Sequence, residues 1–346
     1  MKNWPALIES SIRLPEEGAG FVQSQTVLVT GGAGFIGSEL VRQLAARGLH
    51  VRVVDNLANG IRENLVDVLG ENVEFVVGDV RDEAAMKSLL FGTDLVFHLA
   101  SLGAEGSTQS PSEIHEVNAS ATLRLLNAAR QIGVKRFVYV SSAEVYGTPR
   151  ATPVTEEHPT LPMTVYGASK LAGEAYTRAL WETYRFPTVV VRLFDVYGPR
   201  CHRDGDRGAI PKLMLRCLAG KPMAIFGDRS QAWDLTFVSD AARGILLAGL
   251  SDPAIGKTIN LGGGKEFRML EVAETITHIV GHDEARVEHV EPTHESTSRL
   301  LADTSRARAL IGFEPAVGLR EGLVRLREWY LTQKNPPEEL LEQEVA

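Results

Sequence analysis

Residues 26–37 read TVLVTGGAGFIG, and this stretch decides the fold. The β-branched run 26–30 is typical of a strand buried on both faces of a parallel sheet. The glycines at 31, 34 and 37 then predict a tight turn into a helix that ends near Arg47. Glycine lets a pyrophosphate approach the backbone, and the free N–H groups of a helix N-terminus bind such an anion. The stretch therefore predicts the strand, loop and helix of a dinucleotide site.

A carboxylate stands where such a site needs one. Asp55 ends the second predicted strand, which starts near His50. A carboxylate there accepts hydrogen bonds from the adenine ribose hydroxyls, and it repels the 2′-phosphate of NADP. We therefore expect NAD rather than NADP as the cofactor.

Strands and helices alternate up to about residue 193. The run predicts a Rossmann-type α/β fold, in which a doubly wound parallel sheet is built from right-handed βαβ units. Further strands are expected at Val73–Val77, Leu95–Leu99, Phe137–Ser141 and Val189–Leu193, with helices at Glu83–Leu90, Ser112–Gln131 and Tyr166–Tyr184.

After Pro199 the pattern weakens and predicts a smaller, interleaved C-terminal α/β substrate domain. Its expected elements are helices at Ile210–Ala219, Asp240–Leu250, Leu270–Val280, Ser305–Ile311 and Leu319–Leu331, and short strands at Leu235–Val238 and Lys257–Leu261. We assign residues 1–24 to an N-terminal leader, residues 25–200 with about 232–262 to the NAD-binding domain, and about 201–231 with 263–346 to the substrate domain.

Composition excludes several classes of function. The chain has 346 residues and a net charge of −8, with no cluster of Lys and Arg, so a nucleic-acid partner is not expected. Only Cys201 and Cys217 are present, which favours a reducing cytoplasm over a disulfide framework. No apolar run reaches about 18 residues, so we expect no membrane partner. The histidines match no metal-site spacing, so we expect no metal.

Tyr166 and Lys170 are a candidate acid–base pair, because i,i+4 spacing places them on one helix face. A neighbouring ammonium and an oxidised nicotinamide both stabilise a phenolate, which would lower the pKa of the tyrosine from about 10. Tyr166 would then take a proton from a substrate hydroxyl. Ser142 ends a strand at the ligand-binding edge of such a sheet, where its hydroxyl could hydrogen-bond the same oxygen.

These features are accompanied by a wider set of motifs. The motifs are TGGAGFIG at 30–37, VVDN at 53–56, GDV at 78–80, HLA at 98–100, SSAEVYG at 141–147, YGASK at 166–170, RLFDVYGPR at 192–200 and NLGGG at 260–264. With them the chain resembles the extended short-chain dehydrogenase/reductase family, the NAD-dependent sugar epimerases and dehydratases, over about residues 26–330.

The resemblance implies a role for individual residues. The catalytic set would be Ser142, Tyr166 and Lys170, with Tyr166 and Lys170 also touching the cofactor. The cofactor would be bound by Gly31, Gly34, Phe35, Ile36, Gly37, Asp55, Asn56, Asp79, Val80, Leu99, Ala100 and Ser101. His98 would lie at a strand end facing the cofactor. Members of the family often dimerise through two helices, here those around 112–131 and 166–184, so a homodimer is expected.

The sequence specifies the reaction less closely than it specifies the family. A C4 epimerisation of a nucleotide sugar needs only Ser142, Tyr166 and Lys170, and it is the first choice. Dehydratases of the family carry Asp-Glu after the serine, whereas this chain has Ala143-Glu144. Glu144 keeps a uronate decarboxylase or 4,6-dehydratase open, besides a loop acid without catalytic role. A sugar dehydrogenase or reductase and a non-catalytic NAD sensor are further alternatives.

Two substrate positions depart from the family. Asp195 stands where an asparagine is usual near the substrate diphosphate, and Trp233 stands where an arginine is usual. Arg299 lies in a segment that in the family usually supplies another diphosphate ligand, so it could partly compensate. An acid near a phosphate is repulsive, and an indole can stack on a ring. The departures predict an unusual substrate, or one that is held differently, unless compensating changes elsewhere make them neutral.

Overall fold

The computed structural model describes residues 25–103, 110–201, 208–226, 232–281, 287–290 and 299–342. At its centre is a sheet of seven strands in the order β3-β2-β1-β4-β5-β6-β11, and every pairing is parallel. The strands are β1 (Thr26–Thr30), β2 (His50–Asp55), β3 (Val73–Val77), β4 (Leu95–His98), β5 (Arg136–Ser142), β6 (Thr188–Leu193) and β11 (Thr258–Leu261). This order confirms the Rossmann-type α/β fold.

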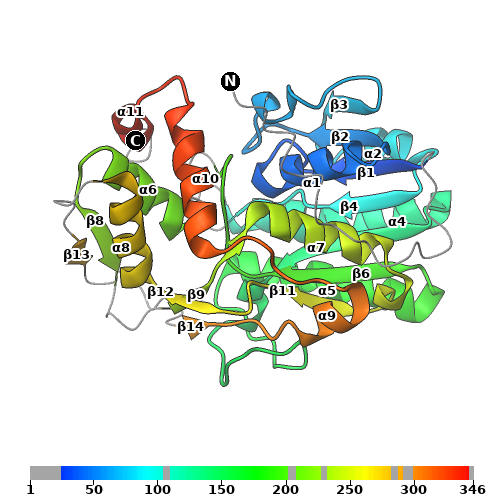
Figure 1. Cartoon of the computed structure of the whole chain (residues 1–346). Coiled ribbons are helices and arrows are strands. Elements are labelled where there is room, and N and C mark those ends of the chain that lie inside the picture. Colours follow the sequence, from blue (N-terminus) through cyan, green and yellow to red (C-terminus); the bar gives the residue numbers. More distant parts are fainter. Residues whose placement is uncertain are drawn as a thin grey trace.

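Helices cover both faces of the sheet (Figure 1). One face packs against α1 (Phe35–Ala45), α7 (Val238–Leu250) and α9 (Ser305–Ile311), and the other against α2 (Glu83–Leu90), α4 (Thr122–Ile132) and α5 (Val165–Tyr184). Because both faces are covered, the strands are mostly apolar and almost entirely buried, as in β1 and β6. The edge strand β3 is the more exposed one.

A second hydrophobic core lies beside the sheet. It is formed by α6 (Ala209–Leu218), β8 (Met223–Phe226), α8 (Met269–Val280), α10 (Leu319–Leu331) and α11 (Pro337–Glu342), and it includes Met214, Val272 and Leu326. In Figure 1 these helices gather on one side of the molecule, with α10 nearest to the sheet. We retain the division into two interleaved domains as a proposal that this separate core supports.

Short strands complete this half of the chain. They are β7 (Val196–Tyr197), β9 (Ala232–Asp234), β10 (Thr236–Phe237), β12 (Glu266–Arg268), β13 (Val287–Val290) and β14 (Arg299–Leu300). β9 pairs with both β12 and β14, and β13 pairs with β8. Most of them were not predicted, because strands of two to four residues are stabilised by partners far away in sequence.

One predicted helix is interrupted. The expected helix 112–131 is α3 (Pro111–His115), then a π-helical turn η3 (Glu116–Ala121), then α4. The π-helical turn contains Asn118. Its Oδ1 accepts a hydrogen bond from the backbone nitrogen of Leu102, and its Nδ2 donates one to the carbonyl oxygen of Leu102. A π-helical turn adds a residue to an otherwise regular helix, and the hydrophobic periodicity of the sequence does not predict where this happens.

Candidate active site

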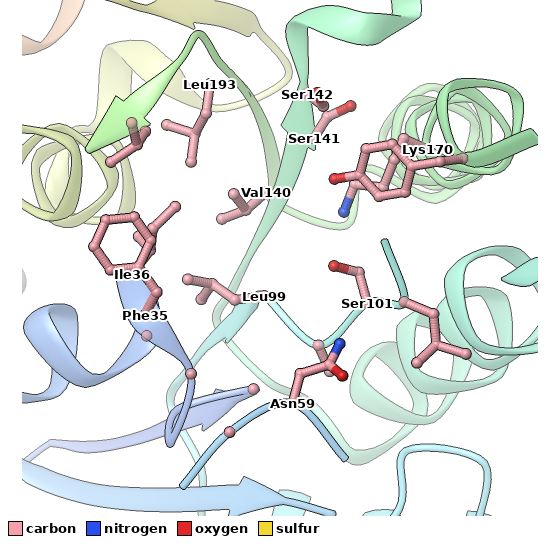
Figure 2. Close-up of a pocket in the computed structure, with 18 of the residues that line it drawn as sticks. Phe35, Ile36, Asn59, Leu99, Ser101, Val140, Ser141, Ser142, Lys170 and Leu193 are labelled. Carbon is pink, nitrogen blue, oxygen red and sulfur yellow. The ribbon is translucent and has the colours of Figure 1, made fainter. Parts of the chain in front are cut away.

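A cavity of about 450 Å³ opens at the carboxyl end of the central strands. In Figure 2, Phe35 and Ile36 lie on one side of it, Lys170 lies on the other, and Val140, Ser141 and Ser142 follow the strand between them. Parallel strands bring their carboxyl ends to one edge, so the residues after β1, β4, β5 and β6 meet there.

The glycine loop forms the wall at the end of β1. Gly31 has φ +70°, and a Cβ built on it would lie 2.7 Å from the backbone nitrogen of Ala100. A Cβ on Gly37 would lie 2.1 Å from the carbonyl oxygen of Gly31. Both positions therefore exclude any side chain. Gly34, the N-cap of α1, supplies no side chain to the first turn, and no acid lies in that turn.

The uncapped N-terminus of α1 fits an anion. Its first residues, Phe35 and Ile36, line the cavity, so their backbone N–H groups and the helix dipole are available to a pyrophosphate. The cradle in which no Cβ fits and the free helix end together match the expected dinucleotide.

Asp55 lines the cavity beyond the glycine loop. Its carboxylate accepts hydrogen bonds from the backbone nitrogens of Ala33 (3.0 Å) and Leu57 (2.9 Å). Burial raises the pKa of Asp55, and these backbone hydrogen bonds oppose that rise. The carboxylate is thus fixed in place against the glycine loop, where we expect the adenine ribose.

The remaining residues expected at the adenosine end are only partly brought together. Asn56 and Val80 line the cavity, whereas Asp79 does not. Asp79 accepts a hydrogen bond from Asn56 Nδ2 at 3.0 Å and pairs with Arg81. The hydrogen bonds from Arg81 hold the pKa of Asp79 well below its usual range. Asp79 therefore acts on the cavity through Asn56.

The wall after β4 is formed by the three residues expected there, which are Leu99, Ala100 and Ser101. Leu99 and Ser101 are visible in Figure 2 between the glycine loop and Lys170. The backbone nitrogen of Leu99 bonds the carbonyl of Thr30 at 3.1 Å, which continues the register of β4 past its last residue.

Ser142 and Glu144 lie at the end of β5 and both line the cavity. The Ser142 hydroxyl accepts a hydrogen bond from the Glu144 nitrogen (3.2 Å) and so caps the short helix η4 (Ala143–Tyr146). Thr164 Oγ1 donates to Glu144 Oε2 at 2.8 Å. Since Thr164 is also the N-cap of α5, this bond fixes Glu144 relative to the helix that carries Tyr166.

Tyr166 and Lys170 lie in the first turns of α5 and line the same cavity as Ser142. Lys170 is buried, and its Nζ lies 4.8 Å from the centre of the Tyr139 ring. Burial lowers the pKa of Lys170 to about 8, and the nearby Glu174 carboxylate opposes this effect. An ammonium beside Tyr166 stabilises a phenolate, so the arrangement suits proton transfer.

The three substrate candidates are placed differently. The Asp195 carboxylate is exposed toward the cavity. Its position inside the cleft, together with the charges of Asp234 and Glu144, raises its pKa to about 7. Trp233 is half-buried on β9 beside Phe267 of β12, and it does not line the cavity. Arg299 belongs to β14, but its side chain lies outside the part of the structure that is described.

His98 corrects an expectation. It ends β4 but is fully buried and absent from the cavity lining. Its Nδ1 lies 2.7 Å from Thr30 Oγ1, and its Nε2 lies 2.8 Å from Thr122 Oγ1, so threonines bind both sides of the ring. Burial and the charge of Lys170 lower the pKa of His98 to about 3, which keeps the ring neutral.

Sequence reasoning missed a buried polar chain next to this histidine. Thr122 donates to the Asn118 carbonyl (2.8 Å), and Asn118 Nδ2 donates to Ser169 Oγ (2.9 Å). Ser169 in turn donates to the carbonyl of Tyr166 at 2.7 Å. The sequence signal for this polar chain was the presence of polar residues within apolar strands and helices, because buried polar groups need hydrogen-bond partners.

Two expected absences concern only the described residues. Within those ranges no group of three or more His, Cys, Asp or Glu side chains could hold a metal ion. None of the helices described is both long enough and apolar enough to cross a bilayer.

Comparison with known proteins adds to this geometry. Residues 27–262 match the model of the NAD dependent epimerase/dehydratase family. The chain is 36% identical over 308 residues to a UDP-glucose 4-epimerase of Mycolicibacterium smegmatis, a match that covers 88% of this chain and 97% of that protein. It is 34% identical over 313 residues to a dTDP-glucose 4,6-dehydratase of Streptomyces niveus, covering 88% and 92%.

A solved structure is also similar to this chain over most of its length. An epimerase of Methanothermobacter thermautotrophicus superimposes with a TM-score of 0.85 at 36% identity, covering 92% of this chain and 95% of that chain.

Gly37→Ala is expected to abolish binding of the dinucleotide and to lower the melting temperature, because the added Cβ would lie 2.1 Å from the Gly31 carbonyl. Gly70→Ala is the matched control, since its Cβ would meet nothing within 4 Å. Calorimetric titration with NAD and thermal unfolding would check both. Binding by Gly37→Ala at the affinity of the control would contradict this view of the loop.

Asp55 is expected to select NAD over NADP, because a fixed carboxylate repels a ribose 2′-phosphate. Titration of the wild-type chain with each cofactor should give weaker binding of NADP than of NAD. Asp55→Asn should reduce this difference in affinity between the two cofactors. Equal affinities in the wild-type chain would remove Asp55 from this role.

Proposed function

Because the chain belongs to the NAD-dependent epimerase/dehydratase family, we propose that this enzyme is a nucleotide-sugar 4-epimerase. Its cofactor is NAD, which when bound accepts and returns a hydride at the sugar carbon. The proposed substrate is a nucleoside-diphosphate hexose, and the reaction inverts C4 by way of a transient 4-keto sugar. Relatives named as UDP-glucose 4-epimerases support this substrate class.

The observation that carries the proposal is the composition of the cavity beside Ser142. Ser142, Tyr166 and Lys170 line it together with the glycine loop. The next residue is Ala143, which is buried and has no acid–base group. An epimerase needs one proton acceptor at the hydroxyl, whereas dehydration needs a further acid and base. The three residues present therefore suffice for epimerisation.

The proposed chemistry is a proton transfer at one oxygen. Tyr166 Oη takes the proton of the C4 hydroxyl, while Ser142 Oγ hydrogen-bonds the same oxygen. The Lys170 ammonium stabilises the phenolate of Tyr166 by charge. When the 4-keto group is reduced from its other face, Tyr166 returns the proton to the oxygen. The residues of the chain are then unchanged at the end of the cycle.

A second candidate reaction rests on two carboxylates of the same cavity. Glu144 and Asp195 both line it, and the charge of Glu144 is one of the causes that raise the pKa of Asp195 to about 7. A pair of carboxyl groups in one cavity can supply a base and an acid. Asp195 would then replace the acid that Ala143 lacks, and the reaction would be a 4,6-dehydration or a decarboxylation at C5.

Assembly and location are also proposals. We propose a homodimer through α4 and α5, which expose Leu123, Ile132 and Tyr184 to solvent in the single chain. Exposed apolar side chains on neighbouring helices suit an interface between copies. We also propose a cytoplasmic enzyme, since the chain has only two cysteines, which suits a reducing compartment.

A panel of nucleotide hexoses tests the reaction. We expect the enzyme to convert a substrate into its C4 epimer without net change of NAD, and Glu144→Gln to retain this conversion. Mass spectrometry and NMR of the products would check it. A product lighter than the substrate by one water or one carbon dioxide would establish the second candidate instead, provided that Glu144→Gln or Asp195→Asn no longer forms this product.

Tyr166→Phe is expected to lower turnover by at least about 10²-fold, because it removes the proton acceptor. Binding of NAD should stay nearly unchanged, since the ring remains. Steady-state kinetics together with NAD titration would separate the two effects. Turnover close to the wild-type value would show that another group accepts the proton.

Substrate binding is expected to weaken as pH rises through about 7, the pKa of Asp195. Below that pH the carboxyl is neutral and can donate a hydrogen bond to a phosphate oxygen. Above it, the carboxylate repels a diphosphate. Binding of UDP-glucose, measured from pH 6 to about 8.5 by calorimetry, should show this loss in the wild-type chain and not in Asp195→Asn.

An Asp195→Asn variant should bind UDP-glucose more tightly than the wild-type chain at pH 8, because a neutral amide does not repel the diphosphate. Since Trp233 does not line the cavity, Trp233→Arg alone should leave the affinity nearly unchanged. Micromolar affinity of the unmodified enzyme for UDP-glucose or UDP-galactose at pH 8 would refute an unfavourable role of Asp195.

A further inference from the structure

Glu174 and Arg192 form a buried ion pair next to the catalytic helix. Arg192 Nε lies 2.9 Å from Glu174 Oε1, and Arg192 Nη2 lies 2.7 Å from Glu174 Oε2. Both side chains are buried, with 0% exposure for Glu174 and 3% for Arg192. Glu174 follows Lys170 by one turn of α5, so the two residues share a face of the helix. The pair therefore anchors this helix to β6.

The same guanidinium reaches the turn that carries Ser142. Arg192 Nη1 donates to the Tyr146 hydroxyl at 2.8 Å, and the guanidinium carbon lies 4.7 Å from the centre of the Tyr146 ring. Tyr146 is the last residue of η4, which Ser142 caps. Its hydroxyl donates onward to Asn260 Oδ1 of β11 at 2.7 Å.

One side chain thus joins three elements that form the catalytic end of the cavity. These are α5 with Tyr166 and Lys170, η4 with the Ser142 turn, and β6, whose continuation contains Asp195. Arg192 and Glu174 do not line the cavity themselves. Replacement of a buried ion pair by apolar residues is often neutral for stability, so stability alone does not explain the pair.

We propose that Glu174 and Arg192 are positioning residues for the reaction, which hold Lys170 beneath Tyr166 and fix the Ser142 turn against α5. The inference rests on the proposed function, since it assigns Tyr166 and Lys170 to proton transfer.

The charge of Glu174 acts on Lys170 as well. Burial lowers the pKa of Lys170, and Glu174 raises it. The other groups that face this ammonium are Tyr166 on its own helix, the ring of Tyr139 on β5 and the neutral His98 on β4. Among these neighbours Glu174 is the group that keeps Lys170 protonated near neutral pH. Without the negative charge of Glu174, Lys170 would lose its proton at a lower pH.

The test variant is Glu174→Gln, which keeps the shape and one acceptor but removes the charge. With lysine labelled at Cε, NMR titration assigned by Lys170→Arg would follow Lys170 directly, without substrate and both with and without NAD. We expect Lys170 to titrate about one pH unit lower in the variant. With substrate, kcat should fall about tenfold or more, with little change in KM, because misplacement acts on the chemical step.

Asp240→Asn is the matched control. Asp240 is buried on α7, pairs with Arg243 at 2.8 Å, and lies on the other face of the sheet from α5. Its loss should lower the melting temperature but leave the Lys170 titration and kcat unchanged. If Glu174→Gln behaves like this control, the pair is only structural and the proposal is wrong.

A second variant tests the proposal if Glu174→Gln does not fold. The double replacement Glu174→Leu, Arg192→Met removes both charges without leaving one unpaired, and Lys170 should again titrate at lower pH. An unchanged titration would overturn the proposal. If no nucleotide sugar is turned over by the wild-type chain, the proposed function fails, whereas the titration still decides this inference.

Discussion

The site depends on one constraint, which is that all seven strands of the central sheet run in the same direction. Whatever residue follows a strand then lies at the same edge as the residues that follow its neighbours. Gly31 after β1, Leu99 after β4 and Ser142 at the end of β5 become neighbours around one cavity, although they are distant in sequence. The close contact of the glycine loop with Ala100 holds two of these ends together.

Charge is distributed unevenly around this cavity. Lys170 supplies a buried cation on one wall, over the Tyr139 ring, and the charge of Glu174 favours its protonated form. Asp195 and Glu144 supply carboxyl groups at the substrate end. Because charges near a bound substrate act on it directly, a change of protonation at these groups would alter both binding and reaction.

The sequence predicted the sheet well because its signals are local. The β-branched run of β1, the glycine loop and the carboxylate of Asp55 each follow from residues within one βαβ unit. Packing over long distances was not predictable in this way. The π-helical turn at Asn118, the position of Trp233 on β9 and the neutral, buried state of His98 all depend on partners from other elements. The pair of Arg192 and Glu174 was missed for the same reason.

The central claim is that one set of residues removes and restores a proton at O4 while the hydrogen at C4 leaves and returns to the same carbon. The most direct measurement follows a deuterium label placed at C4 of the nucleotide hexose that the enzyme turns over. Our account predicts that NMR finds the label still at C4 in the C4-epimeric product. Transfer of the label to C6, or its loss to water, would contradict it.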